Sequence, residues 1–435
     1  MNILLKDWKI LRQKPVAVLG AGISGEGICA LLKHLCWNYR VYDEQKHAFN
    51  INEACSCSIA VISPGFKEDH PWRKILKKSG VSVISEIDFA SNFTKSKLVG
   101  ITGTNGKTTV TTLLAHLWKS FGFETCCAGN IGISLSKQIA LGREPETIFL
   151  EISSFQAKDM YSTKLDSLIW TNFDEDHIDH HETLEDYFYS KCKLLNLVRG
   201  ENLFVGKSVM EFANKVNFRL PEKTKIIEIN KNQNELSESS RFLSSYPQRE
   251  NLSIVEEFIK SKKIKRNDFL ESIKSYKPKR HRLGQVCRIK NACFWNDSKS
   301  TNFASAIAAC KNFSGNVFWI GGGKEKGGIV ENFAKRLIPL IWKAFLIGES
   351  ANVLSKIFKK EGLPFVICES LEEAVNKAFK ETKEYTNILL SPGYASFDSF
   401  KNYEHRGNSF ENYVLNLKNS LTLSTDNLHE KSFAH

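Results

Sequence analysis

The chain lacks the cysteine spacing of a zinc site or of a disulfide framework. Its 11 cysteines are an odd number, and no two of them form a C-x-x-C pair. The closest in sequence are Cys55 with Cys57 and the neighbours Cys126 and Cys127. We therefore expect the reduced thiols of a cytoplasmic protein, and exclude a small disulfide-stapled secreted domain.

The sequence also lacks an apolar run long enough to span a membrane, which needs about 20 residues. The apolar stretch 337–348 is interrupted by Pro339 and Lys343. Residues 1–11 carry both basic and acidic side chains, unlike the apolar segment of a signal peptide. We expect a protein with no membrane partner.

Charge of one sign is only mildly in excess. Lys and Arg number 60 and Asp and Glu 48, which gives a net charge of +12. An excess of this size is compatible with nucleic acid, a membrane surface, an anionic small substrate or a plain basic surface. Because no basic stripe with interleaved aromatic residues is present, we do not expect a nucleic-acid partner.

Short apolar runs alternate with helical patterns along the chain, which predicts an α/β fold with parallel sheets. A length of 435 residues suggests about three domains of roughly 150 residues. The polar stretch 91–97 and the basic segment 277–282 are the candidate boundaries. The predicted strands are 15–19, 39–43, 59–63, 81–84, 98–102, 147–151, 168–171, 317–320, 344–347 and 388–390.

A first glycine-rich turn, Gly20-Ala-Gly-Ile-Ser-Gly25, follows a predicted strand and precedes a predicted helix. Such a turn lets the backbone approach a diphosphate at a helix N-terminus. Asp43 lies 18 residues beyond Gly25, where an acid can bind a ribose. NAD is one interpretation. Another diphosphate, or close strand–helix packing without any ligand, is the alternative.

A second glycine-rich loop, residues 100–109, reads G-I-T-G-T-N-G-K-T-T. Consecutive backbone N–H groups in such a loop can surround phosphates, with Lys107 on the β- and γ-phosphates and the Thr108 hydroxyl on Mg²⁺. The strict P-loop pattern is not met, because Ile101 stands where its first glycine belongs. The combination of strand, loop and helix nevertheless predicts a nucleotide phosphate site.

Acidic residues follow this loop at two places. Glu151 ends a predicted strand, at the edge of the sheet where ligands bind in open α/β folds, although an acid there also commonly caps a helix. Residues 171–182 crowd acids and histidines together. Oxygen ligands with one imidazole suit Mg²⁺ or Mn²⁺ better than zinc, and a solvated acidic loop is the alternative. Lys191, taken alone, is only a helix residue at the surface.

Three polar motifs follow predicted strands in the last third of the chain, at 295–302, 320–328 and 390–407. Each contains cations, hydroxyl groups and glycines or other turn residues. Each alone is compatible with ordinary turn chemistry. Their recurrence within one domain points to an anionic substrate.

Together these motifs resemble those of the Mur ligases over residues 15–417. The run T-G-T-N-G-K-T-T is shared by the Mur and folylpolyglutamate ligases. The runs N-D-S-K-x-T-N and S-P-x-x-A-S-F-D-x-F-K-N-Y-E-x-R-G-x-x-F are similar to those of the branch that adds D-glutamate. In that family the first glycine turn holds UDP instead of NAD.

The resemblance implies three domains and a tail. We expect an N-terminal Rossmann-like domain at 1–94, a central P-loop ATPase-like parallel sheet at 95–280, a C-terminal Rossmann-like α/β domain at 281–420 and a tail at 421–435. They would bind the UDP-sugar substrate, ATP with Mg²⁺, and D-glutamate, in chain order.

Residue by residue, the resemblance implies three binding sets. The set for the UDP substrate is Ile23, Ser24, Asp43, Gly65 and Asn130. The set for ATP is Gly103, Thr104, Asn105, Gly106, Lys107, Thr108, Thr109, Asn251, Arg282, Asp297 and Lys299. The set for D-glutamate is Thr301, Lys326, Ser396, Phe397 and Tyr403.

The same resemblance implies two metal ions, Mg²⁺ or Mn²⁺. Thr108 would bind one, and Glu151, His177 and Lys191 would bind the second. Lys191 is expected as its carbamate, because an ammonium group repels a metal ion whereas a carbamate offers an anionic oxygen. Lys107, His177 and Lys191 would be the catalytic residues.

Two positions depart from the family pattern. Asn251 is all that remains of an H-N-x-x-N motif that contacts adenine, and Gly393-Tyr394 replaces an Ala-Cys or Ala-Ala pair. The phosphate and metal positions are intact, so an active enzyme is expected.

The activity implied is an ATP-dependent ligation of D-glutamate to UDP-N-acetylmuramoyl-L-alanine through an acyl phosphate. Such an enzyme would serve peptidoglycan precursor synthesis, and with it cell shape and division, as a cytoplasmic monomer. The alternative is a related Mur or folylpolyglutamate-type ligase with a different amino acid or acceptor.

Overall fold

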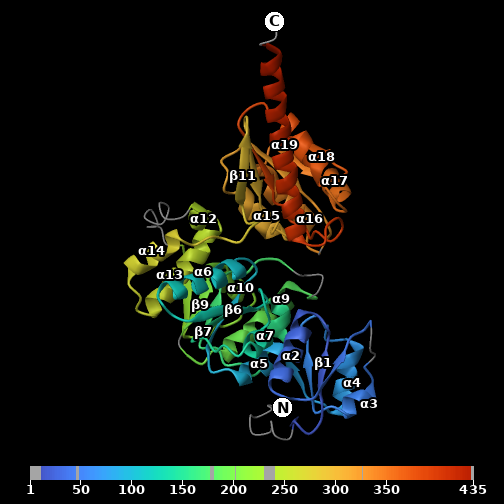
Figure 1. The fold of residues 1–435 in the computed structure, drawn as a ribbon, viewed down its shortest axis with the longest axis vertical. Coiled ribbons are helices and arrows are strands. Elements are labelled where there is room, and N and C mark those ends of the chain that lie inside the picture. The colour runs from blue at the N-terminus through green and yellow to red at the C-terminus, as the bar shows by residue number, and fades with distance from the viewer. Residues whose placement is uncertain are drawn as a thin grey trace. The chain divides into compact units, whose positions relative to one another are not determined.

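The computed structural model describes residues 11–45, 49–176, 181–200, 202–229, 241–325 and 327–432 (Figure 1). These residues form three sheets with helices between their strands, which confirms the predicted α/β fold class. Two predicted site residues, His177 and Lys326, lie outside the described residues. None of the helices within these ranges is both long and apolar enough to cross a membrane.

The first sheet has four parallel strands in the order β2-β1-β3-β4. Its middle strands, β1 and β3, are fully buried apolar runs, as expected for a parallel sheet covered on both faces. The strands are β1 (Val16–Leu19), β2 (Tyr39–Tyr42), β3 (Ile59–Ile62) and β4 (Val83–Ser85). The helices are α2 (Ile23–His34), α3 (Ile51–Cys55), α4 (Pro71–Ser79) and α5 (Glu86–Ala90).

The second sheet has six parallel strands in the order β10-β9-β8-β5-β7-β6. Its strands are β5 (Lys97–Thr102), β6 (Thr125–Gly129), β7 (Thr147–Glu151), β8 (Ser167–Trp170), β9 (Leu203–Gly206) and β10 (Thr224–Ile227). Its helices are α6 (Lys107–Ser120), α7 (Leu135–Ala140), α8 (Ser154–Lys158), α9 (Leu184–Cys192), α10 (Lys207–Lys215), α13 (Gln248–Ser261) and α14 (Arg266–Lys274). Strand β5 lies between β7 and β8, so the ends of these three strands are neighbours.

The third sheet has the order β11-β12-β16-β13-β14-β15, and only the β11–β12 pair is antiparallel. Its strands are β11 (Gly284–Ile289), β12 (Ala292–Asn296), β13 (Val317–Gly321), β14 (Lys343–Leu346), β15 (Phe365–Ile367) and β16 (Thr386–Leu390). Its helices are α15 (Phe303–Cys310), α16 (Val330–Leu337), α17 (Ala351–Lys360), α18 (Leu371–Lys380) and α19 (Tyr403–Ser432). Helix α19 thus continues into the residues expected as a tail.

The described residues separate into two compact units. One holds the first and second sheets, and the other holds the third sheet together with residues 174–176 and 241–248, the latter including α12 (Arg241–Ser244). A single hydrophobic core joins the first two sheets, with Val18 of β1 and Leu150 of β7 among its members. The third sheet has a separate core on each face.

A buried carboxylate strengthens the junction between the first two sheets. Asp88 on α5 is 1% exposed. It accepts hydrogen bonds from the backbone N–H groups of Tyr161, Ser162 and Thr163 at 2.7, 3.2 and 2.9 Å, and from the Thr163 hydroxyl at 2.5 Å. A second link joins Arg73 of α4 to Asp159 through two hydrogen bonds of 3.0 and 2.7 Å. Polar bonds therefore fix the two sheets at defined points, in addition to the shared core.

We expect Asp88→Asn to lower the free energy of unfolding by about 3 kcal/mol, because an amide N–H₂ would face donors that now meet a charged acceptor. Urea unfolding of the full chain measures this. Asp69→Asn, at an exposed position, is the matched control and should stay within about 0.5 kcal/mol of the parent. Equal urea midpoints for Asp88→Asn and the parent would contradict the assignment.

Candidate active site

The predicted phosphate loop leaves no room for side chains at two of its glycines. It connects β5 to α6 and includes Gly103 at φ +144° and Gly106 at φ +83°. A Cβ atom at Gly103 would lie 2.0 Å from Thr171 Oγ1, and one at Gly106 would lie 2.2 Å from Asn251 Oδ1. Both positive φ values and both contacts require glycine. Asn251, the remnant of the adenine motif, therefore packs directly against the phosphate loop.

Residues after β8 hold the loop from its other side. Asn172 accepts from the N–H of Thr104 through its carbonyl, at 3.1 Å, and from the N–H of Asn105 through Oδ1, at 2.9 Å. The Thr171 hydroxyl donates to the Asn105 carbonyl at 2.6 Å. Sequence reasoning did not assign a role to Thr171 or Asn172. Their position directly after a strand that neighbours β5 was the available signal.

The Lys107 ammonium group lies over the same loop. Its Nζ donates to the carbonyls of Gly103 and Thr104 at 2.7 and 2.8 Å. Thr108 follows at the start of α6, where the helix dipole and unpaired N–H groups favour an anion. The geometry therefore places a cation, a hydroxyl group and a helix N-terminus together, as the sequence predicted for a nucleotide phosphate site.

Glu151 brings an uncompensated oxygen to the neighbouring strand end. It is the last residue of β7, is 2% exposed, and pairs in register with Ile101 of β5. Its Oε1 accepts from Asn130 Nδ2 at 2.9 Å, whereas its Oε2 is buried with no hydrogen-bond partner among the described residues. Since a buried carboxylate oxygen without a partner is costly, a cation at this place would satisfy it. The donor chemistry fits Mg²⁺.

Lys191 also reaches the end of β5. It is 1% exposed, and its Nζ donates to Thr102 Oγ1 at 3.2 Å and to the Gly103 carbonyl at 3.1 Å. The same Nζ lies 4.8 Å above the ring of Tyr187, one helical turn earlier on α9. Lys191 is thus a buried residue at the phosphate loop, and not the surface helix residue that it suggests when taken alone.

The structure describes only some of the residues expected to bind metal. Within the described ranges, no three His, Cys, Asp or Glu side chains gather as a metal site. Of the expected ligands Glu151, His177 and Lys191, only Glu151 is both described and of those types. The structure brings Glu151 and Lys191 to adjacent strand ends, and the contribution of His177 stays a prediction.

The first glycine turn is also shaped by close contacts. A Cβ atom at Gly25 would lie 1.9 Å from the Gly20 carbonyl oxygen. Asp43 Oδ2 accepts from the N–H of Ala21 at 3.2 Å, so this acid supports the turn itself. Ile23, at the start of α2, is 71% exposed. An apolar side chain so open next to the turn is available to a ligand.

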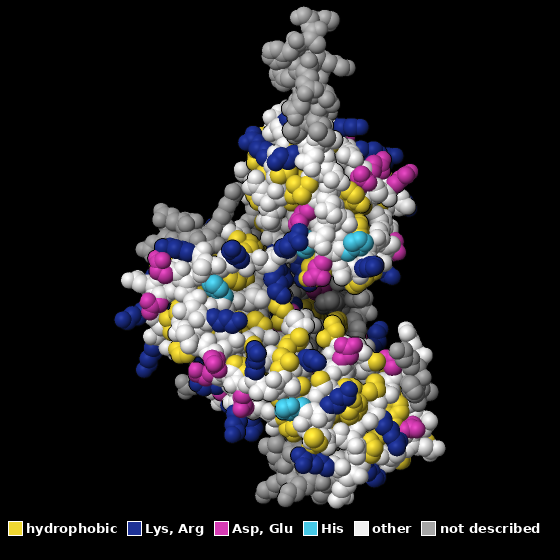
Figure 2. Space-filling view, in the orientation of Figure 1, with side chains coloured by type: hydrophobic (Ala, Val, Ile, Leu, Met, Phe, Trp, Pro, Cys, Tyr) yellow, Lys and Arg dark blue, Asp and Glu magenta, His cyan; other side chains and the backbone are white. Residues whose placement is uncertain are grey.

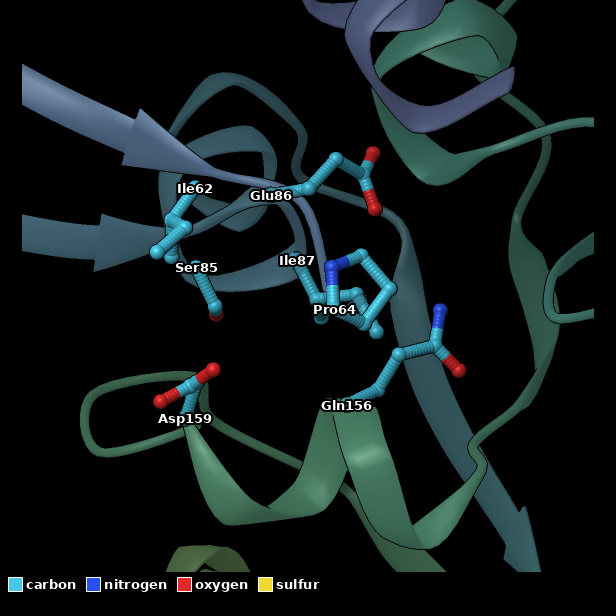
Figure 3. A pocket seen from close by; sticks show the side chains of 7 residues that line it. All are labelled: Ile62, Pro64, Ser85, Glu86, Ile87, Gln156 and Asp159. Carbon is cyan, nitrogen blue, oxygen red and sulfur yellow. The ribbon is translucent and has the colours of Figure 1, made fainter. Parts of the chain in front are cut away.

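A hollow of about 230 Å³, measured with the part open to solvent, adjoins this region (Figure 3). It lies between elements of the first sheet and α8, and Pro64, next to the predicted Gly65, is on its wall. In Figure 3, Ser85 and Asp159 point toward one another, and Glu86 points away from Asp159. The lining residues are Ile62, Pro64, Ser85, Glu86, Ile87, Gln156 and Asp159. The surface beside Gly65 is therefore concave, but its enclosed part has room for only about one water molecule.

Glu86, on the wall of this hollow, is a buried acid. Burial raises its pKa, although the N–H of Ser136 donates to Oε1 at 2.6 Å and opposes that shift.

In the second unit the three polar motifs meet at neighbouring strand ends. They follow β12, β13 and β16, and β16 lies between the other two. Lys324 and Ala395 exchange two backbone hydrogen bonds of 2.9 and 3.1 Å, which joins the second motif to the third. Lys299 Nζ lies 4.0 Å above the Tyr403 ring, joining the first to the third. Ser396 is buried, whereas Phe397 is 65% exposed.

Arg406 is a buried cation that sequence reasoning did not single out. It is 1% exposed, and its guanidinium donates to Ser298 Oγ at 3.0 Å, to the Ser298 carbonyl at 2.9 Å and to the Tyr394 carbonyl at 3.2 Å. Burial lowers its pKa to about 10. Arg406 therefore connects the loop that carries Asp297 and Lys299 with the loop that carries Ser396.

Tyr394, one of the two departures from the family pattern, fills space in a core. Its ring lies 5.1 Å from Phe303 and 6.1 Å from Phe333, and it is 2% exposed. The large residue is thus accommodated inside the unit, against two phenylalanine rings.

Asp297, predicted to contact the nucleotide, has an unusual environment. Burial raises its pKa to about 7, although the Ser391 hydroxyl, the Leu283 N–H and the charges of Arg282 and Arg406 all oppose the shift. The two hydrogen bonds measure 2.8 and 3.1 Å. Because its pKa is raised, the folded protein keeps the proton on Asp297 at pH values at which the unfolded chain has lost it.

For Asp297 this predicts a pH dependence of stability with a definite sign. Between about pH 4 and 7 the folded state holds more protons than the unfolded state, so this residue makes folding less favourable as the pH rises. Asp297→Asn removes the titration. We expect its stability advantage over the parent to grow by roughly 2–4 kcal/mol from pH 5 to 7.5.

Urea unfolding of the ligand-free protein at several pH values measures this difference. Asp268→Asn, at an exposed position on α14, is the control and should run parallel to the parent. If the stability of Asp297→Asn changed with pH in parallel with that of the parent, the raised pKa assigned to Asp297 would be wrong.

Comparison with known proteins gives a consistent result. Residues 101–269 match the family model described as Mur ligase middle domain. A UDP-N-acetylmuramoylalanine–D-glutamate ligase of Thermoanaerobacter pseudethanolicus is 30% identical over 457 residues, covering 94% of this chain and 99% of that protein.

Two solved structures show the same fold. UDP-N-acetylmuramate-alanine ligase of Thermotoga maritima is similar with a TM-score of 0.57 at 15% identity, over 93% of this chain and 100% of its own. The MurF ligase of the same organism, in complex with ADP, is similar with a TM-score of 0.57 at 15% identity. The match covers 94% of this chain and 96% of that ligase. Both similarities extend over nearly the whole chain, so the fold is shared across its length. The chain belongs to the Mur ligase family, and it is a ligase.

Proposed function

We propose that this chain is the ATP-dependent ligase that joins D-glutamate to UDP-N-acetylmuramoyl-L-alanine in peptidoglycan precursor synthesis. The reaction class is carried by one observation: the Lys107 ammonium group and the buried, unpartnered Glu151 oxygen lie at neighbouring strand ends beside a phosphate loop. The amino acid is carried by similarity to enzymes named for D-glutamate. ADP bound to the similar MurF ligase supports ATP as the nucleotide.

The first step would be attack by the alanyl carboxylate on the γ-phosphorus of ATP. The bond from phosphorus to the ADP oxygen breaks, and an acyl phosphate forms. Two anions must approach each other, so positive charge at the loop lowers the barrier. Lys107, the N–H groups of the loop and the start of α6 would hold the phosphates in line. Thr108 would hold one Mg²⁺ ion, and Glu151, His177 and carbamylated Lys191 would hold the second; bound Mg²⁺ offsets phosphate charge.

The second step would join the amino acid. The amine of D-glutamate, in its deprotonated form, attacks the carbonyl carbon, and a tetrahedral intermediate expels phosphate. The amine gives up one proton to solvent as the amide forms. Thr301, Lys326, Ser396, Phe397 and Tyr403 would position the amino acid, with Lys326 offering a cation to a carboxylate. Exclusion of water protects the acyl phosphate from hydrolysis.

Three domains would divide this work. We assign 1–94 to the UDP-sugar substrate, 95–280 to ATP with two Mg²⁺ ions and 281–420 to D-glutamate, with 421–435 as a tail. The set for the UDP substrate would be Ile23, Ser24, Asp43, Gly65 and Asn130. The chain would act as a cytoplasmic monomer.

Asn130 connects the proposed substrate site with the proposed metal site. Its side-chain amide donates to Glu151 Oε1 at 2.9 Å. A residue proposed for the UDP substrate is thereby in contact with a residue proposed for the metal. The substrate carboxylate would thus reach the phosphate loop next to the ion.

We expect ADP release from ATP and UDP-N-acetylmuramoyl-L-alanine to depend on D-glutamate, with L-glutamate at least about a hundredfold less effective, because hydrogen bonds specify the amino acid. A coupled ADP assay with single amino acids measures this. Release driven by another amino acid, or by a folate acceptor with glutamate, would instead favour a related Mur or folylpolyglutamate-type ligase.

We expect Lys191→Ala to reduce kcat at least about a hundredfold and a short carboxylic acid such as acetate to restore part of the activity. The acid would supply the anionic oxygens that a carbamate provides. Lys107→Ala should lose turnover without any rescue, because a phosphate-binding cation is missing there. Lys193→Ala, two residues further along, should keep normal turnover. Full activity of Lys191→Ala, or no response to acetate, would contradict the carbamate.

A further inference from the structure

A line of three polar side chains runs from the interior of the first unit to the partly exposed Asp186, beside the proposed metal site. His181 Nε2 lies 3.0 Å from Ser154 Oγ, and His181 Nδ1 lies 3.2 Å from Asp186 Oδ2. Since a carboxylate only accepts, Nδ1–H donates to Asp186, and Nε2 is left to accept the Ser154 hydroxyl proton. All three groups thus have one consistent set of proton positions.

The three residues are of the types found in a hydrolytic triad, but no substrate could reach the serine. His181 is 0% exposed and Ser154 is 2% exposed. The His181 ring stacks on Phe155 at 5.5 Å with an interplanar angle of 8° and contacts the Tyr187 ring at 5.1 Å. A nucleophile needs a substrate within reach, and Ser154 is enclosed by the protein. The arrangement must therefore act on the protein itself.

What His181 connects are the elements that carry the proposed metal ligands. Ser154 begins α8, three residues after Glu151 at the end of β7. Asp186 and Tyr187 belong to α9, which also carries Lys191. His181 therefore hydrogen-bonds to both elements, one through each ring nitrogen, and the ion pair of Lys158 with Asp186 at 3.7 Å is a second link between α8 and α9.

Tyr187 extends the connection to the phosphate loop. Its hydroxyl donates to Thr104 Oγ1 at 3.2 Å, and its ring lies 4.8 Å below Lys191 Nζ. The His181 ring, the Tyr187 ring and the Lys191 ammonium group thus follow one another. A shift of His181 would move Tyr187, and with it both Lys191 and the loop.

We propose that His181 is a positioning residue that sets the spacing between the Glu151 side and the Lys191 side of the metal site. The proposal rests on the function proposed above, because it needs an ion between those residues. His181 is fully buried, so we assign it no contact with substrate. Its ring fixes α8 through a buried hydrogen bond to Ser154 and α9 through a part-buried one to Asp186, and it fixes Tyr187 through ring contact. Partners of this kind, one step behind the ligands, typically change metal affinity or activity 10- to 100-fold when replaced.

The test uses the full chain and Mn²⁺ as the probe, titrated without substrates and followed by electron paramagnetic resonance. We expect His181→Phe, which keeps the ring packing and loses both hydrogen bonds, to weaken Mn²⁺ binding 10- to 100-fold. The kcat should fall with it, and the half-saturating Mg²⁺ concentration should rise. The KM for ATP at saturating Mg²⁺ should change less than about threefold. His34→Phe, at an exposed position, is the matched control.

Conservative variants separate positioning from general damage. His181→Asn keeps a donor toward Asp186 and should recover part of the Mn²⁺ affinity. Ser154→Ala removes one hydroxyl and should weaken Mn²⁺ binding by itself, so it tests the proposal even if His181→Phe does not fold. Combined with His181→Phe, it should add nothing.

Parent-like Mn²⁺ affinity and kcat in both His181→Phe and Ser154→Ala would overturn the positioning role. A parent protein that binds no Mn²⁺ would overturn it as well. A parent that binds Mn²⁺ but shows no D-glutamate-dependent ADP release would count against the proposed function, while the Mn²⁺ titrations would still decide the role of His181.

Discussion

The close approach of backbone and neighbours at the phosphate loop is the constraint on which the site depends. The loop lies between Thr171 and Asn172 after β8 and Asn251 on α13, with no space for a Cβ atom at Gly103 or Gly106. The strand order supplies this arrangement, because β5 lies between β7 and β8. The ends of three strands therefore bring together the glycine loop proposed to bind phosphate, a carboxylate oxygen without a partner among the described residues, and a buried lysine. A side chain at Gly103 would collide with Thr171, and one at Gly106 with Asn251, so the loop would have to shift.

Groups of opposite charge are gathered at these strand ends. Glu151 has a buried oxygen with no partner among the described residues, while Lys107 and Lys191 donate to backbone carbonyls of the loop. Those bonds are available to be exchanged for phosphate and metal contacts. The net charge of the chain has little part in this. On the face shown in Figure 2, Lys and Arg side chains are scattered among Asp and Glu side chains, and only a few cations have a proposed ligand.

Local patterns predicted the elements and the loops, because apolar runs and glycines act over a few residues. The ten predicted strands, both glycine turns and Lys107 lie where the sequence places them, whereas β6, β9, β10, β11 and β15 were not predicted. The supports of the site were not predictable in that way. Asn172, Tyr187, His181 and Arg406 act through residues far away in sequence, and their roles depend on which strands are neighbours. Lys191 shows the same limit: its helix pattern says nothing of the strand end that its ammonium group reaches.

Buried polar side chains with several hydrogen-bond partners hold the loops at three places. Asp88, His181 and Arg406 are each buried, and each is the partner of several groups from separate segments. A charged or polar group costs free energy to bury, so it is stable there only while all its partners stay in place. An apolar contact can slide and keep most of its energy, because it has no direction. A buried polar group with several directed bonds cannot. The fold uses apolar cores to join its sheets and such groups to fix the few distances on which the proposed chemistry depends.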